Sequence, residues 1–192
     1  MVLGMLAKSV PDLEILLTFQ ANPNTRVSGT LSVDGTVHKI DPKESFALFE
    51  RQWGNFGIGK GYYLLWLFLK TGEVLCSWSL EPELDGTAKI AFASIWHPNG
   101  LHEMIPVGPN SKAEDISISS KTGVKYFNKF FLDLPARDAS FTFTKWIREA
   151  EITPTVEQRY IVISESYGEG TARFNGRDLR VHGHVEQLST LR

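Results

Sequence analysis

Residues 64–80 read LLWLFLKTGEVLCSWSL, two apolar runs on either side of the dipeptide Thr71–Gly72. Glycine adopts the positive φ angles that tight hairpin turns require. In the second run Val74, Cys76 and Trp78 lie two residues apart, and a period of two is that of a β-strand. The stretch therefore predicts an antiparallel hairpin, and it sets the pattern for the rest of the chain.

Turn signals of the same kind recur along the sequence, among them DG at 34–35, TG at 122–123 and NG at 175–176. The segments between them are rich in β-branched and aromatic residues, a series typical of an all-β sandwich or barrel. A closed barrel leaves no strand edge exposed, and a barrel of about eight or more strands can hold a small ligand. Strands are predicted near residues 13–20, 26–33, 36–40, 46–53, 61–70, 73–80, 88–96, 101–106, 124–133, 140–148, 157–167 and 179–188, with a loop at 108–115.

Length and composition indicate a single domain over residues 1–192, with residues 1–25 as a segment that could cover the barrel. The single cysteine, Cys76, cannot form an internal disulfide, so a reducing, cytoplasmic location is expected. The net charge of −2, with no basic stripe, argues against a nucleic-acid partner. No apolar run approaches the ~20 residues of a membrane helix, so no membrane partner is expected.

The run YYLLWLFL at 62–69 is apolar on both faces of the predicted strand. In a barrel its outer face must then be covered. Cover by the N-terminal segment of the same chain is the favoured interpretation, and a homodimer is the alternative.

Several charged residues fall in phase with apolar neighbours. Lys145 shares a face with Phe141 and Phe143, and Glu165 continues the face of Ile163. One interpretation places these groups inside an apolar chamber, which is how small-molecule sites are built. The other places them at strand ends, where the face reaches solvent, and for any single residue this second interpretation is favoured.

The stretch Glu50-Arg51-Gln52-Trp53 is harder to explain by solvation alone. Successive residues of a strand point to opposite faces, so four large side chains in a row cannot all face solvent. At least one of them is expected to point inward.

The sequence contains no P-loop, dinucleotide fingerprint or nucleophile elbow, and neither a cofactor nor a metal is expected. His182, His184 and Glu186 share one face of a predicted strand. This spacing is weak evidence for a metal site, and a solvated polar face is the favoured interpretation.

Five tryptophans and twelve phenylalanines give the chain a high aromatic content. Most of these rings are expected to fill the core. Flat walls around a hydrophobic small-molecule substrate are the alternative. The residues proposed as walls are Trp53, Trp66, Trp78, Trp96, Phe92 and Phe143.

Four segments together resemble a known superfamily. They are VSGTLSVDGTVHKIDPKESFALFERQWG at 27–54, LLWLFLKTGEVLCSWSLEPELDG at 64–86, ISSKTGVKYFNKFFLDLP at 118–135 and SYGEGTARFNGRDLRVHGHVEQL at 166–188. In this order they resemble the hydroxyneurosporene synthase-like, lipocalin-like superfamily, over roughly residues 26–188. Two departures stand out, because Glu50 occupies a position that is usually Asp and Gly168 one that is usually Trp.

The resemblance implies a lipocalin-like antiparallel β-barrel with an internal ligand cavity. The superfamily includes carotenoid hydratases, a kievitone hydratase and fungal Diels–Alderases, which work without a redox cofactor or metal. Its members commonly carry a pair of lipocalin-like domains, so a site at a domain junction would be absent here or rebuilt within one barrel.

The leading hypothesis is a cofactor-free cyclase that performs an intramolecular [4+2] closure on a polyketide or terpenoid intermediate of natural-product biosynthesis. The enzyme would fold a flexible substrate into its reactive conformer. Lys145, Arg51 or Tyr160 would donate a hydrogen bond to a substrate carbonyl. Glu50 or Glu165 would orient that donor or act as a base.

Two alternatives remain open. A hydratase or isomerase would need a carboxyl group as acid and base, which Glu165, Glu50 or Glu169 could supply. A non-catalytic lipocalin-like carrier would bind a small molecule without changing it.

Overall fold

The computed structural model describes the backbone of residues 2–10, 13–55, 59–153 and 161–190, and the side chains of 25–51, 59–153 and 161–190. The chain divides into two compact units, residues 1–57 and 58–192, and each is described by itself. Within the described residues, no helix has the length and apolar character needed to cross a membrane.

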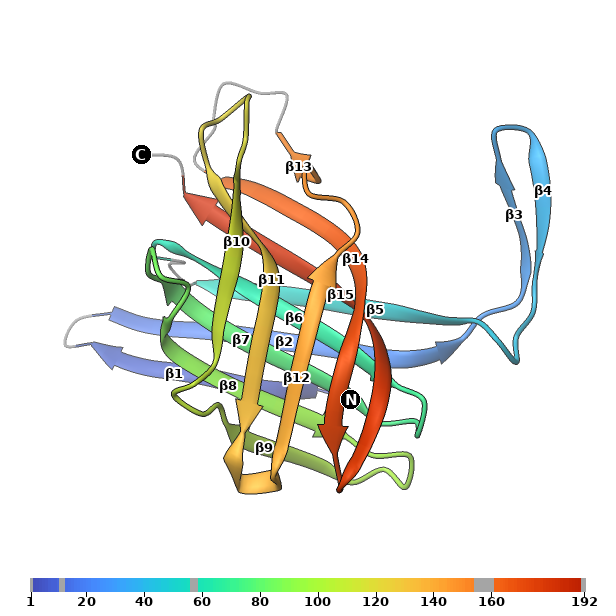
Figure 1. The fold of residues 1–192 in the computed structure, drawn as a ribbon, viewed down its shortest axis with the longest axis horizontal. Helices are drawn as coiled ribbons and strands as arrows, with labels where there is room; N and C mark the ends of the chain where they lie inside the picture. The colour runs from blue at the N-terminus through green and yellow to red at the C-terminus, as the bar shows by residue number, and fades with distance from the viewer. Residues whose placement is uncertain (1, 11–12, 56–58, 154–160, 191–192) are drawn as a thin grey trace. The chain divides into compact units, whose positions relative to one another are not determined.

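Unit 1 is built from two antiparallel sheets (Figure 1). One has the strand order β1-β2-β5, and the other is a ribbon of β3 and β4 joined by a tight turn at Asp34–Gly35, where both residues have positive φ. The strands are β1 (Val2–Val10), β2 (Leu13–Arg26), β3 (Gly29–Val33), β4 (Thr36–Ile40) and β5 (Phe46–Asn55).

Unit 2 is one ten-stranded antiparallel sheet with the order β10-β11-β12-β14-β15-β6-β7-β8-β9, and β13 pairs with β14. A 3-10 turn, η1 (Pro135–Arg137), joins two of its strands. The strands are β6 (Gly61–Leu69), β7 (Val74–Pro82), β8 (Ala88–Trp96), β9 (His102–Pro106), β10 (Lys112–Ile118), β11 (Lys125–Leu134), β12 (Ala139–Lys145), β13 (Glu151–Ile152), β14 (Ile161–Phe174) and β15 (Arg177–Thr190).

The sheet of unit 2 curls, so that β10–β12 cross over β6–β9 (Figure 1). The space between the two halves holds a cluster of buried apolar side chains. Within it, the rings of Tyr63 on β6 and Phe130 on β11 are 5.4 Å apart. The Gln187 side chain on β15 bonds both the N–H and the C=O of Phe127 on β11, at 2.9 Å each. These contacts hold the curled halves together across the interior.

Phe143 lies at the centre of this packing and is fully buried. Two glycines that face each other in the β14–β15 ladder, Gly168 and Gly183, make room for its ring. A Cβ atom at Gly168 would approach the Phe143 ring to 2.7 Å and the carbonyl oxygen of Thr144 to 2.1 Å. The position that is usually Trp in the resembled superfamily can therefore accept only glycine here.

The predicted all-β class is confirmed, and most predicted strands lie within two or three residues of the observed ones. The predicted loop at 108–115 is wrong from Lys112 onward, because β10 pairs there with β11 through its backbone, and exposed charged side chains do not disturb that pairing. The predicted strand at 140–148 ends at Lys145, and β14 continues to Phe174, beyond the predicted end at residue 167. Residues 2–10 form β1 and were not predicted as a strand.

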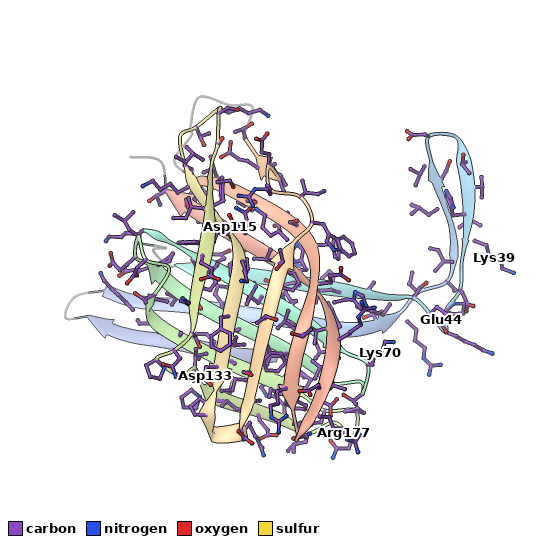
Figure 2. All side chains as sticks on the ribbon, in the orientation of Figure 1. Lys39, Glu44, Lys70, Asp115, Asp133 and Arg177 are labelled. Atoms are coloured by element: carbon purple, nitrogen blue, oxygen red, sulfur yellow. The ribbon has the colours of Figure 1, made fainter. Side chains whose placement is uncertain are left out.

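The single-domain prediction stays a prediction, and so do the covering role of residues 1–25 and the internal ligand cavity. Where the structure describes the interior of unit 2, apolar side chains from β6, β7, β11, β12 and β15 pack against one another (Figure 2).

Candidate functional site

The sheet of unit 2 has a second face, opposite to the packed cluster, on β14, β15 and β6–β9. Residues paired across antiparallel strands lie on the same side of a sheet. One row of paired residues runs from Tyr167 through His184, Trp66 and Cys76 to Ser94. The neighbouring row contains His182, Phe68, Val74, Trp96 and His102. We call this side the aromatic face.

Aromatic rings on this face lie against one another. Trp66 and Trp96 stack with their centroids 5.4 Å apart and their planes 27° apart. Trp78 contacts Tyr62 at 4.9 Å and is nearly parallel to Phe92 at 6.4 Å. The three tryptophans are buried, with Trp66 completely withdrawn from solvent. These two groups of packed rings, Trp66 with Trp96 and Trp78 with Tyr62 and Phe92, form an aromatic wall along this side of the sheet.

A carboxylate and an imidazole meet at one end of this wall. Nε2 of His184 lies 2.7 Å from a carboxylate oxygen of Glu165, and the two side chains are 19% and 31% exposed. The contact has ion-pair distance but lacks the alignment of a hydrogen bond. Nδ1 of His184 is buried and has no hydrogen-bond partner among the described residues. The Tyr167 ring lies 5.4 Å from the imidazole.

A second carboxylate lies beside this pair. Glu186 on β15 is paired with Glu165 in the β14–β15 ladder and accepts a hydrogen bond from the hydroxyl of Tyr62. The described residues thus bring two carboxylates, an imidazole and a phenol together next to the tryptophans. This is a set of groups that can move a proton on a bound ligand.

The structure brings five of the predicted site residues to the aromatic face. They are Glu165, Trp66, Trp78, Trp96 and Phe92. Glu169, the further acid–base candidate, is also on this side but is exposed.

Phe143 and Lys145 lie on the opposite, interior side, so the structure does not bring them to the wall of tryptophans. The Lys145 amine donates to the Arg148 carbonyl at 3.1 Å and to the Ser164 hydroxyl at 3.3 Å, and it lies 5.7 Å from the centre of the Tyr126 ring. Burial, with a smaller contribution from the Arg148 guanidinium, lowers the pKa of Lys145 to about 8. Its contacts are those of a structural residue at the polar end of the core.

Next to Lys145 lies a fully paired carboxylate. Glu151 accepts hydrogen bonds from Ser119 at 2.8 Å, Thr122 at 2.6 Å and the Tyr126 hydroxyl at 2.7 Å. Burial opposes the ionisation of Glu151, but the three hydroxyl donors outweigh it and lower its pKa. A carboxylate bound in this way has little capacity left for a ligand.

The remaining predicted residues belong elsewhere. Glu50 and Arg51 lie on β5 of unit 1, where they pair with Ala21 and Gln20 on β2. The Trp53 side chain and Tyr160 lie outside the described residues. Their roles stay predictions.

Sequence reasoning missed His184 and His102 as site residues. The sequence favoured a solvated polar face for His182, His184 and Glu186. In the structure only His182 of these three is exposed. The signal lay in the strand pairing, which sets His184 beside Trp66 and His102 beside Trp96. Among the described residues, no group of three or more His, Cys, Asp or Glu side chains is arranged to hold a metal ion.

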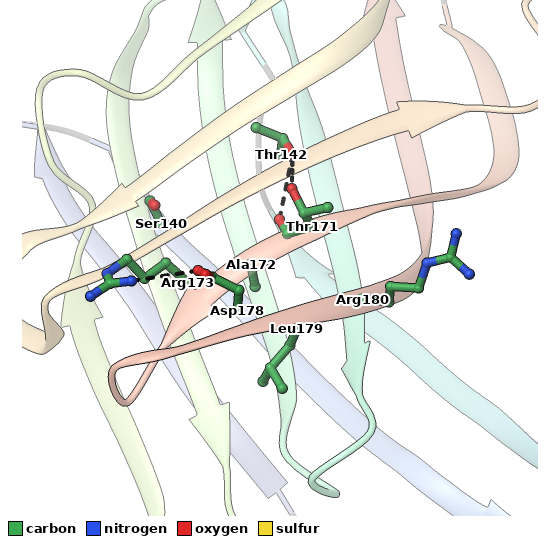
Figure 3. A pocket seen from close by; sticks show the side chains of 8 residues that line it. All are labelled: Ser140, Thr142, Thr171, Ala172, Arg173, Asp178, Leu179 and Arg180. Carbon is green, nitrogen blue, oxygen red and sulfur yellow. Dashed lines mark hydrogen bonds and ion pairs between the residues drawn. The ribbon is translucent and has the colours of Figure 1, made fainter.

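Further along β14 and β15 a groove of about 480 Å³ opens on the same side of the sheet (Figure 3). The hydroxyls of Thr142 and Thr171 bond each other at 2.8 Å beneath it. Arg173 pairs with the exposed Asp178 and points away from Arg180, so the groove does not concentrate positive charge.

Comparison with known proteins finds similarity to a curated sequence and to solved structures. No protein-family model matches the chain. A dehydratase, asqC of Emericella nidulans, is 28% identical over 120 residues, which are 61% of this chain and 35% of that protein.

The crystal structure of kievitone hydratase from Nectria haematococca superposes with a TM-score of 0.76 at 20% identity, over 91% of this chain and 53% of that one. A Nitrosomonas europaea protein assigned as an ATTH gives a TM-score of 0.70 at 16% identity, over 97% and 55%. The predicted lipocalin-like fold is thereby confirmed. The chain spans about half the length of these structures and about a third of the dehydratase.

Proposed function

We propose that this chain is a cofactor-independent hydratase or dehydratase that acts on a hydrophobic, oxygenated intermediate of secondary metabolism. The observation that carries the proposal is the Glu165–His184 pair, whose second imidazole nitrogen is buried without a partner beside a wall of tryptophans. Buried polar atoms are nearly always hydrogen-bonded in folded proteins. A ligand group is the natural partner for Nδ1 of His184.

The pair has the chemistry for elimination of water. His184 Nδ1 takes the proton from the carbon next to a substrate carbonyl, and the Glu165 carboxylate stabilises the imidazolium that forms. The imidazolium returns that proton to the hydroxyl group on the next carbon, which leaves as water as the C–O bond breaks. The elimination is neither an oxidation nor a reduction of the substrate. Hydration follows the same steps in reverse.

Two further observations support this assignment. The related sequence bears the name of a dehydratase, and a protein of the same fold that of a hydratase. The buried rings of Trp66, Trp78 and Trp96 make the surroundings of the imidazole apolar and exclude water from it.

The test uses the purified 192-residue chain with benzylideneacetone and its hydration product, 4-hydroxy-4-phenylbutan-2-one, in H₂¹⁸O and in D₂O. We expect catalysed ¹⁸O incorporation into the alcohol and deuterium incorporation next to the carbonyl. Glu165→Gln and His184→Asn should each lower the rate by about 10²–10⁴-fold. Lys129→Gln, an exposed change on β11, is the control that should keep full activity. Equal rates in the wild-type chain and both site variants would refute the proposal.

A [4+2] Diels–Alder-type closure of a polyketide or terpenoid intermediate is the second candidate function. It is supported by the aromatic character of this face, where rings such as Trp96 and Phe92 would help to hold a folded polyene in a reactive conformer. Such a closure leaves neither ¹⁸O nor deuterium in the product, so the same labelling experiment separates the two candidates. His184→Asn would then slow the reaction only slightly.

A further inference from the structure

Two neighbouring residues at the far end of the aromatic face each bury a polar atom that has no partner in the described part of the chain. Trp96 is the last residue of β8, and His102 is the first residue of β9. The two residues are paired in the ladder, and the centroids of their rings are 4.7 Å apart. Nε1 of Trp96 and Nε2 of His102 are both buried, and neither has a hydrogen-bond partner in the described part of the chain. Trp96 itself is only 8% exposed.

The fold does not account for this arrangement. Phenylalanine at position 96 would keep the stack on Trp66 without burying an N–H group, and an apolar residue at position 102 would avoid a buried imidazole nitrogen. An unsatisfied buried donor or acceptor carries a desolvation penalty that a packing role does not repay. Because the two residues are paired neighbours with rings 4.7 Å apart, one ligand group that both accepts and donates can complete the hydrogen bonds of the indole N–H and the imidazole nitrogen.

We propose that Trp96 and His102 form a binding subsite for a neutral hydroxyl group, most simply a phenol, at the distal end of the substrate. The indole N–H donates to the hydroxyl oxygen, and the imidazole nitrogen accepts the hydroxyl proton. The subsite rests on the proposed function in that its ligand is the substrate of the Glu165–His184 pair.

The charge state of the subsite agrees with a neutral ligand. Burial lowers the pKa of His102, so its imidazole is neutral near pH 7 and offers an acceptor lone pair. An indole and a neutral imidazole carry no net charge to bind a carboxylate or phosphate. A hydroxyl uses both groups, whereas a ketone would leave the imidazole nitrogen unpaired.

The spacing sets the length of the ligand. Trp66 stands between the two ends of the wall, paired with His184 on one side and stacked on Trp96 on the other. From β15 to β8 there are three strand spacings, on the order of 14 Å. A substrate that reacts at His184 and is bound at Trp96 should therefore have about the length of two aromatic rings joined by a short linker.

The test compares 2-naphthol with 2-methylnaphthalene, which has the same shape without the hydroxyl group, by calorimetric titration of the 192-residue chain. We expect 2-naphthol to bind the wild-type chain more tightly, and Trp96→Phe and His102→Phe each to weaken it by about three- to tenfold. Both variants should weaken the binding of 2-methylnaphthalene clearly less than that of 2-naphthol, because only 2-naphthol loses a hydrogen bond. Phe92→Leu, a change on the same face away from the subsite, should affect the two ligands equally.

Equal affinity of the wild-type chain for the two ligands would overturn the subsite, and so would equal losses for both ligands in Trp96→Phe and His102→Phe. Each variant is titrated at the same interval below its own melting temperature, so that unfolding is not mistaken for a loss of binding. Glu165→Gln separates this inference from the proposed function. It should lower the turnover of benzylideneacetone by about 10²–10⁴-fold and leave the affinity for 2-naphthol unchanged, so either proposal can fail without the other.

Discussion

The two faces of the unit 2 sheet both bury large side chains, but their buried polar groups differ in whether they have partners. On the interior side, Gln187 and Lys145 have close hydrogen-bond partners, and Glu151 at its polar end accepts three hydrogen bonds. On the aromatic face, Trp96 and His184 each bury a nitrogen that has no partner in the described residues. The same sheet therefore carries a satisfied core on one side and unsatisfied groups on the other.

This difference separates structural from functional polar groups better than burial or residue type does. A completed hydrogen bond contributes to folding, and its loss leaves a partner unpaired. An unpaired group costs stability and is retained where a ligand completes it. Lys145 attracts attention in the sequence because it is charged and in phase with phenylalanines, yet its amine serves the core.

The largest effect is expected at the centre of the packed side. Phe143→Ala should lower the free energy of unfolding by about 3–5 kcal/mol, because it removes a fully buried ring and leaves a cavity. Phe92→Ala, at a half-buried ring of the aromatic face, should cost clearly less. Urea denaturation followed by circular dichroism measures both. Equal losses would show that the two faces do not differ as packing environments.

Alternation along the chain predicted much of this arrangement. The phase of Val74, Cys76 and Trp78 was correct, as was the shared face of Phe141 and Phe143. Period-two patterns are local, and the first residue of a strand fixes the side of every other one. The fold class and the composition of each face therefore followed from the sequence.

The pairing of strands that are distant in sequence could not be predicted from alternation. His184 lies beside Trp66 because β15 pairs with β6, 118 positions earlier in the chain by the residue numbers. Nothing local distinguishes a histidine that faces tryptophans from one that faces water, as His182 does. The predicted set therefore contained the tryptophans and Glu165 of the aromatic face but lacked the imidazole beside them.

Gln187→Leu tests the satisfied side by creating unpaired groups. The substitution leaves the N–H and the C=O of Phe127 buried without their partner, and each orphaned group costs about 1–3 kcal/mol. We expect a loss of about 2–4 kcal/mol in the free energy of unfolding. Ser189→Ala on the same strand should change it by less than about 0.5 kcal/mol. A loss no larger than that of Ser189→Ala would mean that the bridge to Phe127 does not hold the sheet closed.

Lys145→Met tests whether the buried amine costs stability when it is charged. The pKa of Lys145 is lowered to about 8, below its value in the unfolded chain, so the unfolded state binds more protons between these two values. The stability of the wild-type chain should therefore rise with pH in this window, by about 2 kcal/mol from pH 7 to pH 9.5. Lys145→Met should lack this rise. Parallel pH profiles of the two proteins, measured by urea denaturation, would show that the amine is not desolvated in the folded state.

The smallest effect on the free energy of unfolding is expected on the aromatic face, and its size separates the two sides of the sheet. Trp96→Phe keeps a ring against Trp66 but removes the buried N–H that has no partner in the described residues. The lost packing and the relieved desolvation oppose each other, so the free energy of unfolding should change by less than about 1 kcal/mol. Gln187→Leu, also at a buried polar group, should cost at least twice as much. A loss of about 2 kcal/mol or more for Trp96→Phe would mean that its N–H is satisfied within the protein, and the aromatic face would then be a second structural core.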